Sequence, residues 1–291
     1  MSRVYEALWK SEQQHLPPDS CATAPETPEE VIQRAVAEPA EFDGAGTFQL
    51  HPSPDQLLVA VTDEESLGAE KFRVLGARIN NLRSQREIKT LLITSGGPGE
   101  GKTLVAANLA VILAKRTNQK VLLIEGDLRR PAFERLFGVG PLRGLTHWWK
   151  SAKESVCHYL YRAAPLPLWI LSAGGPAEQP IQILQSKRLT ELMGELAGWF
   201  DWIIIDSPPL LPLADPNLWA RLADGTLLVV RENNTSRKTL EKGLESLDDP
   251  KLIGVVLNEA MEVTKSDYYN SYYGTARKAE GNGNSKQKSG V

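Results

Sequence analysis

The sequence predicts an α/β protein with a doubly wound, mostly parallel sheet and flexible N- and C-terminal tails. Three observations lead to this fold class. Short apolar runs alternate with helical stretches, a glycine-rich string follows the first run, and acidic residues end two of the later runs. Runs that are apolar throughout indicate strands buried on both faces, and strands that alternate with helices build parallel sheets.

The expected strands are five apolar runs, and a shorter run gives a sixth candidate. They cover residues 91–93, 121–124, 202–205, 227–230 and 252–257, with 168–171 as the sixth. A helix is expected over 70–82, because apolar residues recur there every three or four positions. A second helix is expected over 104–114, a stretch rich in alanine and leucine.

Composition narrows the functional classes. Lys and Arg total 33 against 36 Asp and Glu, so no bulk positive charge points to nucleic acid or to an anionic membrane. The 2 cysteines, Cys21 and Cys157, exclude a disulfide scaffold and a four-cysteine zinc site. The apolar runs are far shorter than the roughly 20 residues that span a bilayer, and Glu6 and Lys10 stand where a secretory signal is apolar. We therefore expect a cytoplasmic protein that does not bind nucleic acid.

The first part of the chain differs in composition from its middle. Residues 12–65 include twelve acidic side chains, one basic side chain and seven of the 19 prolines. Such a stretch buries too little apolar surface to offset the loss of chain entropy on folding. We therefore expect residues 1–65 to be a largely disordered segment that precedes the domain.

The last part of the chain is also set apart. Beyond Thr264 it is polar and rich in Gly, Asn, Ser and Lys, a composition typical of flexible tails. Disordered segments are usually poor in aromatic residues, yet four of the chain's 7 tyrosines cluster there, at Tyr268, Tyr269, Tyr272 and Tyr273. We expect a domain over 66–264 and a flexible tyrosine-cluster tail over 265–291.

A phosphate-binding loop is predicted between the first strand and the second helix. Residues 96–103 read Gly-Gly-Pro-Gly-Glu-Gly-Lys-Thr, which fits the G-x-x-x-x-G-K-[ST] pattern. Glycines let backbone N–H groups point at phosphate oxygens, and the N-terminus of the following helix favours the same anion. The lysine is expected to reach the β- and γ-phosphates of ATP and the threonine hydroxyl to hold Mg²⁺. The predicted nucleotide-binding residues of this loop are Gly97, Gly99, Glu100, Gly101, Lys102, Thr103 and Leu104.

Acidic side chains are expected beside this loop, because a P-loop site needs a carboxylate on a neighbouring strand to hold the metal and its waters. Asp206 follows one apolar run, and Glu125 and Asp127 follow another. The carboxyl ends of parallel strands meet at one edge of a sheet, where ligands of doubly wound proteins bind. The three acids are therefore expected at the edge that carries the loop, as in a sheet of the P-loop NTPase type.

Taken in order, the loop, the two acidic strand ends and the tyrosine cluster resemble the bacterial tyrosine kinases (BY-kinases) of capsule and exopolysaccharide export. The matching strings are Glu125-Gly126-Asp127-Leu128-Arg129-Arg130-Pro131 and Asp206-Ser207-Pro208-Pro209. In that family the three motifs are the Walker A, A′ and B motifs. The resemblance covers residues 66–274 and implies an ATP-dependent protein-tyrosine autokinase that phosphorylates its own C-terminal tyrosines and thereby regulates polysaccharide polymerisation and export.

The resemblance also implies roles for individual residues. The implied catalytic residues are Lys102, Glu125, Asp127 and Asp206. The implied Mg²⁺ ligands are Thr103, Asp127 and Asp206, and Asn258 is implied to contact the adenine base of ATP. The implied phosphate acceptors are Tyr268, Tyr269, Tyr272 and Tyr273.

Two positions of the nucleotide site differ from related sequences. The cell-division and plasmid-partition ATPases carry an additional lysine where this chain has Gly97, and its absence favours the kinase branch. The kinases usually have Asp where this chain has Glu125, whose carboxylate is displaced by about one methylene. Asp127 is therefore expected to carry more of the proton abstraction.

Assembly and partners are implied by the resemblance as well. The family's oligomerisation helix has the pattern Glu-x-x-Arg-x-x-Arg, of which Glu70 and Arg73 keep the first two charges and Gly76 replaces the third. The implied state is a ring-like homo-oligomer when unphosphorylated. The implied partners are a membrane-anchored activator or polysaccharide co-polymerase protein, which recruits the kinase to the inner face of the membrane, and a tyrosine phosphatase.

Two other functions stay open at this point. One is a P-loop ATPase that switches partners through its nucleotide state and transfers phosphate only to water, an interpretation that Glu125 favours. The other is a non-catalytic ATP-binding scaffold of the export machine, which would bind nucleotide tightly without turnover. The product formed from ATP distinguishes the three functions. A kinase forms phosphotyrosine, an ATPase releases free phosphate, and a scaffold forms neither.

Overall fold

The computed structural model describes the central part of the chain. The described residues are 42, 44–52, 57–116, 119–151, 153–232, 235–245, 247 and 251–260. Most of the predicted N-terminal segment and the whole tyrosine cluster lie outside them, so those two predictions stay predictions.

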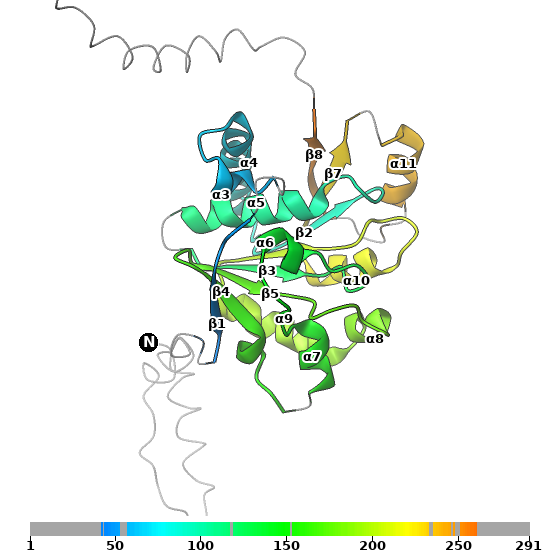
Figure 1. The fold of residues 1–291 in the computed structure, drawn as a ribbon. Coiled ribbons are helices and arrows are strands. Elements are labelled where there is room, and N and C mark those ends of the chain that lie inside the picture. Colours follow the sequence, from blue (N-terminus) through cyan, green and yellow to red (C-terminus); the bar gives the residue numbers. More distant parts are fainter. Residues whose placement is uncertain are drawn as a thin grey trace, which may run out of the picture. The chain divides into compact units, whose positions relative to one another are not determined.

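The described residues contain one 8-stranded sheet (Figure 1). Its strands are β1 (Gly46–Gln49), β2 (Thr90–Ser95), β3 (Val121–Glu125), β4 (Leu160–Ala164), β5 (Leu168–Leu171), β6 (Trp202–Asp206), β7 (Gly225–Arg231) and β8 (Leu252–Asn258). Their order is β1-β4-β5-β3-β6-β2-β7-β8, and every neighbouring pair is parallel except β4 and β5. The mostly parallel sheet predicted from the apolar runs is confirmed, and all six candidate runs are strands.

Helices cover both faces of this sheet (Figure 1). They are α3 (Val59–Thr62), α4 (Leu67–Arg83), α5 (Lys102–Lys115), α6 (Phe133–Phe137), α7 (Leu145–Lys150), η3 (Val156–Tyr159), α8 (Pro180–Leu184), α9 (Lys187–Trp199), α10 (Asp215–Leu222) and α11 (Arg237–Glu245). Apolar residues of α4, α5 and α6 pack into one core, whereas those of α7, α8, α9 and α10 pack into a second. Within the described ranges, every helix is too short or too polar to cross a membrane.

The two cores meet through the strands. Leu91 and Ile93 of β2 enter the core under α4 and α5, and Leu92 between them enters the other core. All three side chains are fully buried. Successive side chains of a strand point to opposite faces, which explains why these runs are apolar throughout.

One part of the expected N-terminal segment is folded. β1 and α3 both precede residue 66, and β1 pairs with β4 in parallel. Leu58 and Ala60 are buried, and the Phe48 ring lies 6.3 Å from that of Phe137. The expectation of disorder is therefore wrong for residues 44–52 and 57–65. A few apolar side chains of these ranges pack into the hydrophobic core that the rest of the domain forms. The acidic residues within these ranges, Asp63, Glu64 and Glu65, are all exposed.

Candidate functional site

The loop between β2 and α5 has the backbone of a phosphate-binding loop. Gly99 and Gly101 have φ angles of +78° and +89°, which side-chain-bearing residues rarely adopt. A Cβ on Gly101 would also lie 2.1 Å from Nδ2 of Asn258. The Ser95 hydroxyl donates to the Gly97 carbonyl over 2.7 Å, which closes the start of the loop. These contacts explain the glycines and leave the start of α5, with its unpaired N–H groups, facing the loop.

Glu100 is turned inward within this loop. Its side chain is buried, and one carboxylate oxygen accepts a hydrogen bond from the Thr235 hydroxyl. The other oxygen has no hydrogen-bond partner among the described residues. If Glu100 contacts the nucleotide as predicted, it therefore does so through its backbone N–H group and not through its side chain.

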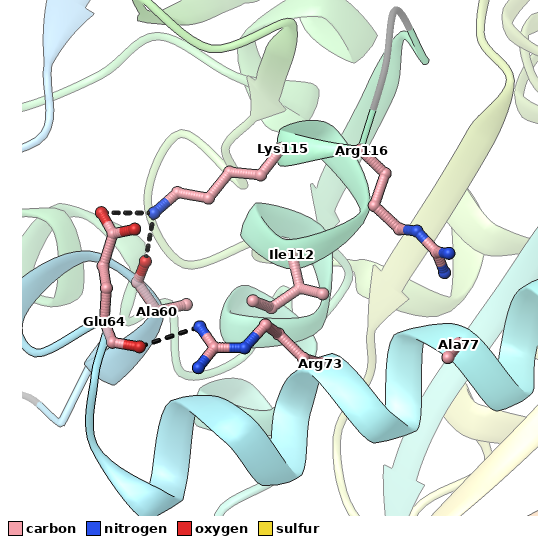
Figure 2. Close-up of a pocket in the computed structure, with 7 residues that line it drawn as sticks. All are labelled: Ala60, Glu64, Arg73, Ala77, Ile112, Lys115 and Arg116. Carbon is pink, nitrogen blue, oxygen red and sulfur yellow. Dashed lines mark hydrogen bonds and ion pairs between the residues drawn. The ribbon is translucent and has the colours of Figure 1, made fainter. Parts of the chain in front are cut away.

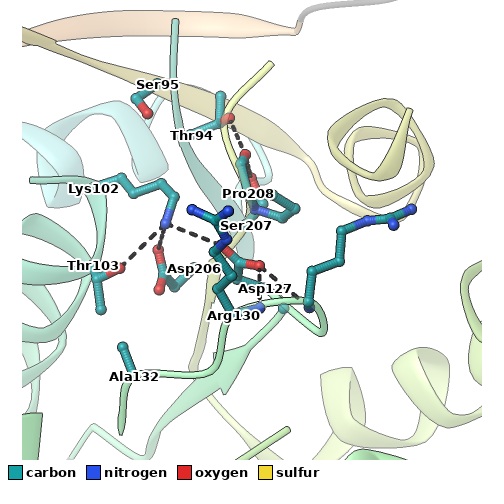
Figure 3. Close-up of polar contacts among 12 residues, drawn as sticks. Thr94, Ser95, Lys102, Thr103, Asp127, Arg130, Ala132, Asp206, Ser207 and Pro208 are labelled. Carbon is teal, nitrogen blue, oxygen red and sulfur yellow. Dashed lines mark hydrogen bonds and ion pairs between the residues drawn. The ribbon is translucent and has the colours of Figure 1, made fainter. Parts of the chain in front are cut away.

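Lys102 lies between two of the predicted acids (Figure 3). Its Nζ is 3.4 Å from Oδ2 of Asp127 and 3.9 Å from Oδ1 of Asp206. The same Nζ is 3.4 Å from the Thr103 hydroxyl. Four residues predicted for the site, from α5 and from the carboxyl ends of β3 and β6, are thus brought together.

Asp206 is a buried carboxyl group. Asp206 is only 1% exposed. Burial raises the pKa of its carboxyl group to about 6, although the positive charge of the neighbouring Lys102 opposes that shift. Its Oδ1 atom has no hydrogen-bond partner among the described groups. Its ion pair with Lys102 is long, at 3.9 Å, and a buried oxygen without a hydrogen bond is unfavourable in the free protein, so this atom is suited to a cation that arrives with the ligand.

Asp127 is held by the backbone that follows it. Its Oδ1 accepts hydrogen bonds from the N–H groups of Arg129, at 3.3 Å, and Arg130, at 3.1 Å. Its Oδ2 is the oxygen that faces Lys102. Asp127 therefore presents one oxygen to the site and uses the other to stay in place.

Glu125 has a different environment. It is fully buried, and its Oε1 accepts hydrogen bonds from the N–H groups of Ala132 and Phe133 at 2.5 and 2.6 Å. Its Oε2 accepts from the Ser172 hydroxyl and the Ala173 N–H, both at 2.9 Å. The carboxylate thus joins the start of α6 to the end of β5. Its placement favours a structural role over the catalytic role that the resemblance implied.

The residues present fit a magnesium ion that arrives with a nucleotide. The described residues contain no group of three or more His, Cys, Asp or Glu side chains that could hold a metal ion alone. Magnesium in nucleotide sites is usually held by one or two protein oxygens together with phosphate oxygens and water. The Thr103 hydroxyl and the Asp206 oxygen that lacks a hydrogen bond provide such oxygens at one place, and Asp127 lies on the other side of Lys102.

The end of β8 is attached to the phosphate-binding loop. The Asn258 side-chain amide donates to the Glu100 carbonyl over 3.0 Å, and Arg231 donates to the Gly99 carbonyl over 3.4 Å. Arg231 also forms an ion pair with Glu259. Asn258 therefore lies at the edge expected for a nucleotide contact.

The residues predicted for oligomerisation lie at the other end of α5. Arg73 of α4 donates to the Glu70 carboxylate over 2.7 Å and to the Glu64 carbonyl over 2.8 Å. Arg73, Lys115 and Ile112 line a hollow of about 380 Å³, and Figure 2 shows how these side chains lie around it. Glu70 and Arg73 are both exposed, and such pairs contribute about 0–1 kcal/mol. Glu70 and Arg73 pair with each other within one chain, which does not test a contact between chains. Oligomerisation therefore stays a prediction.

Several contacts of the site were not expected from the sequence. Arg129 forms a two-point ion pair with Asp215, and the Trp219 indole donates to the Gly126 carbonyl over 3.0 Å. Thr235 holds Glu100, as described above. The sequence signal for Asp215 is its position as the first residue of a helix soon after an acidic strand end. We find no comparable signal for Thr235 or Trp219.

Comparisons with known proteins agree with this geometry. The family model of the CobQ/CobB/MinD/ParA nucleotide binding domain matches residues 91–275. The tyrosine-protein kinase YwqD of Bacillus subtilis is 34% identical over 220 residues, which cover 75% of this chain and 91% of YwqD. The succinoglycan biosynthesis transport protein ExoP of Rhizobium meliloti is 30% identical over 213 residues, or 69% of this chain and 26% of ExoP. The kinase domain of the Escherichia coli tyrosine kinase ETK is 25% identical with a TM-score of 0.64, covering 72% of this chain and 83% of that structure.

Proposed function

This chain belongs to the bacterial protein-tyrosine kinases, and on that premise we propose that it transfers the γ-phosphoryl group of ATP to tyrosines near its own C-terminus. The proposed acceptors are Tyr268, Tyr269, Tyr272 and Tyr273, which lie outside the described residues. The observation that supports this most strongly is the position of Lys102 between Asp127 and Asp206, in the first turn of the helix after a glycine loop. We take residues 66–264, extended to include β1, as the kinase domain.

The loop and its lysine are suited to holding the nucleotide. The N–H groups of the glycine loop and the start of α5 would bind the β- and γ-phosphates. Lys102 would stabilise the charge of the transferred group. Thr103 and Asp206 would hold Mg²⁺, which, when bound, neutralises charge between the two phosphates. Asn258, beside the same loop, would contact the base.

Asp127 is the best-placed proton acceptor. The tyrosine oxygen would bond to the γ-phosphorus as the bond from that phosphorus to the β-phosphate oxygen breaks, which releases ADP. The phenolic proton would pass to Asp127 Oδ2, the oxygen that is free of backbone contacts. Glu125 would not take part in this step, because both of its oxygens already accept two hydrogen bonds. Transfer of this kind depends mainly on positioning and on electrostatic stabilisation.

Phosphorylation would reverse the charge of the tail. Residues 264–291 contain five basic and two acidic side chains. Each phosphotyrosine adds about −1.5 to −2 charges, so two of them cancel the net charge of +3 and three make the segment negative. A negative tail would be repelled from the site that holds the nucleotide phosphates, and we expect this to loosen the ring-like homo-oligomer and to make a tyrosine phosphatase the resetting partner.

The proposed setting is polysaccharide export. ExoP, a succinoglycan biosynthesis transport protein, is several times longer than the stretch that this chain matches. We propose that this kinase acts at the inner face of the membrane with a membrane-anchored activator or polysaccharide co-polymerase. The resulting phosphorylation cycle would control polymerisation and export.

The proposal is tested by a phosphosite map. Purified protein is incubated with Mg-ATP beside Lys102→Met, and phosphate is located by mass spectrometry. We expect phosphate on the four tail tyrosines of the wild type and none on Lys102→Met. Phosphate released to water without phosphotyrosine would show a nucleotide-dependent switch instead, and bound nucleotide without turnover would show a scaffold. Either result would overturn the kinase proposal.

A further inference from the structure

The loops after β3 and β6 carry the two acids of the site, Asp127 and Asp206. Arg129 joins these loops. Its Nε donates to Oδ2 of Asp215 over 2.9 Å, and its Nη2 donates to Oδ1 over 3.0 Å. This is the fork geometry in which an arginine fixes a carboxylate both in distance and in orientation. The two loops are therefore joined by a contact with little rotational freedom.

Because Asp215 is buried, its carboxylate depends on the contact with Arg129. Its side chain is 0% exposed, whereas that of Arg129 is 39% exposed. A fully buried carboxylate needs a partner, and Asp215 has Arg129 and the N-terminal end of α10, where it is the first residue. The hydrogen bonds that Arg129 donates to Asp215 also raise the pKa of the Arg129 guanidinium. Arg129 is thus committed to this contact.

The consequence reaches Asp127 through the backbone. The N–H groups of Arg129 and Arg130 hold Asp127 Oδ1, so fixing the Arg129 side chain also fixes the two donors that orient this carboxylate. Figure 3 shows Asp127 turned toward Lys102 from this loop. Two further contacts tie the same strand end: Gly126 N–H donates to the Asp206 carbonyl over 2.7 Å, and Trp219 donates to the Gly126 carbonyl.

We propose that Arg129 and Asp215 form a positioning pair, which keeps the free oxygen of Asp127 directed at Lys102 and the incoming hydroxyl, and keeps Asp127 in register with Asp206. The proposal rests on the function proposed above. In this proposal neither residue of the pair contacts ATP or tyrosine. The pair acts on the rate of transfer, because it sets the orientation of the proton acceptor, and it leaves the glycine loop that binds ATP unchanged.

The test uses the full-length protein and variants that keep the shape of the pair. Asp215→Asn removes the charge, and Arg129→Lys keeps the charge but loses the fork. Phosphotyrosine formation, ADP formation, KM for ATP and thermal midpoint are measured for each variant and for the double variant. Arg143→Lys is the matched control, because Arg143 contacts Glu154 over 2.9 Å beside β4, which three strands separate from β2 in the sheet.

The expected result separates kcat from KM. Asp215→Asn should lower kcat about 10- to 100-fold, the range seen when a supporting hydrogen bond of a reactive group is removed, with KM for ATP within about twofold. Arg129→Lys should retain more activity than Asp215→Asn. The double variant should be no worse than Asp215→Asn alone, because both changes break one contact. Arg143→Lys should keep the wild-type kcat.

Three results would overturn the positioning role. They are an unchanged kcat in folded Asp215→Asn, an equal loss in Arg143→Lys, and independent losses that add in the double variant. Failure of the kinase proposal looks different. ADP would form in the wild type without phosphotyrosine, and ADP formation would still fall in Asp215→Asn, because Asp127 would then act on water.

Discussion

Replacement of Asp206 by asparagine is expected to stabilise the free protein while it abolishes phosphotransfer. The Asp206 side chain is 2% exposed and its Oδ1 has no hydrogen-bond partner among the described groups, so its ionised form is disfavoured in the folded state. An asparagine at this position would keep the shape of the side chain without its charge. The gain in stability and the loss of activity would then have one cause.

The magnitude follows from the pKa. Folding raises the pKa of Asp206 from 3.8 to about 6, and each unit corresponds to about 1.4 kcal/mol. Because the folded state binds the proton more tightly, the protonated group favours folding at low pH, and this contribution is lost as pH rises through about 6. Asp206→Asn should therefore gain about 3 kcal/mol over the wild type at pH 7.5 and about 1.5 kcal/mol at pH 5.

Urea denaturation in EDTA, at pH 7.5 and at pH 5, measures this difference. Asp127→Asn is the matched control, because it loses charge-assisted bonds to two backbone N–H groups and should not be stabilised. With Mg-ADP added, the wild type should gain stability and Asp206→Asn should gain much less. An Asp206→Asn protein that is less stable than the wild type at pH 7.5 in EDTA would refute the reasoning.

Three further substitutions test other parts of the structure. Glu125→Gln should lose about 1–3 kcal/mol of stability by denaturant titration, because an amide NH₂ cannot accept backbone hydrogen bonds. Its phosphotyrosine yield per folded molecule should stay within about tenfold of the wild type, and a folded but inactive variant would return proton abstraction to Glu125. Gly101→Ala should abolish Mg-ADP binding by calorimetry, since its Cβ would lie 2.1 Å from Asn258 at a φ of +89°; unchanged affinity would contradict this. Gly76→Arg, which restores the family's third charge, should lower the thermal midpoint, because a Cβ there lies 2.9 Å from Ile112 and overpacking costs about 1–3 kcal/mol. A larger assembly with an unchanged midpoint, by ultracentrifugation, would contradict that explanation.

The sequence predicts those features whose signal is local. The runs that became β2, β3 and β6 are apolar throughout, which reveals strands buried on both faces. The glycine loop is a contiguous string, and the acids directly follow their strands. Parallel strands then require Asp127 and Asp206 to meet at one edge, and the structure brings them to Lys102.

Features that depend on distant partners were not predictable in this way. β4 has a mixed polarity, with Tyr161 and Arg162 only half-buried, and its partner β1 comes more than a hundred residues earlier. The position of Glu125 at a strand end predicts a site residue. Four groups donate hydrogen bonds to the Glu125 carboxylate, and one of them, Ser172, is 47 residues away in the sequence. Only the fold reveals that both carboxylate oxygens are already occupied by these bonds. Asp215 likewise meets Arg129 across 86 residues.

The attachment of β8 to the glycine loop has a practical consequence for engineering. Asn258 ties β8 to the Glu100 carbonyl, and Arg231 of β7 reaches the Gly99 carbonyl, so any sequence joined after Ala260 starts beside the glycine loop. A heterologous peptide could replace the native extension there without touching the nucleotide pocket. Substrate preference and tether length would then become separately adjustable, and libraries of exchanged peptides on one unaltered domain would report which sequences it modifies.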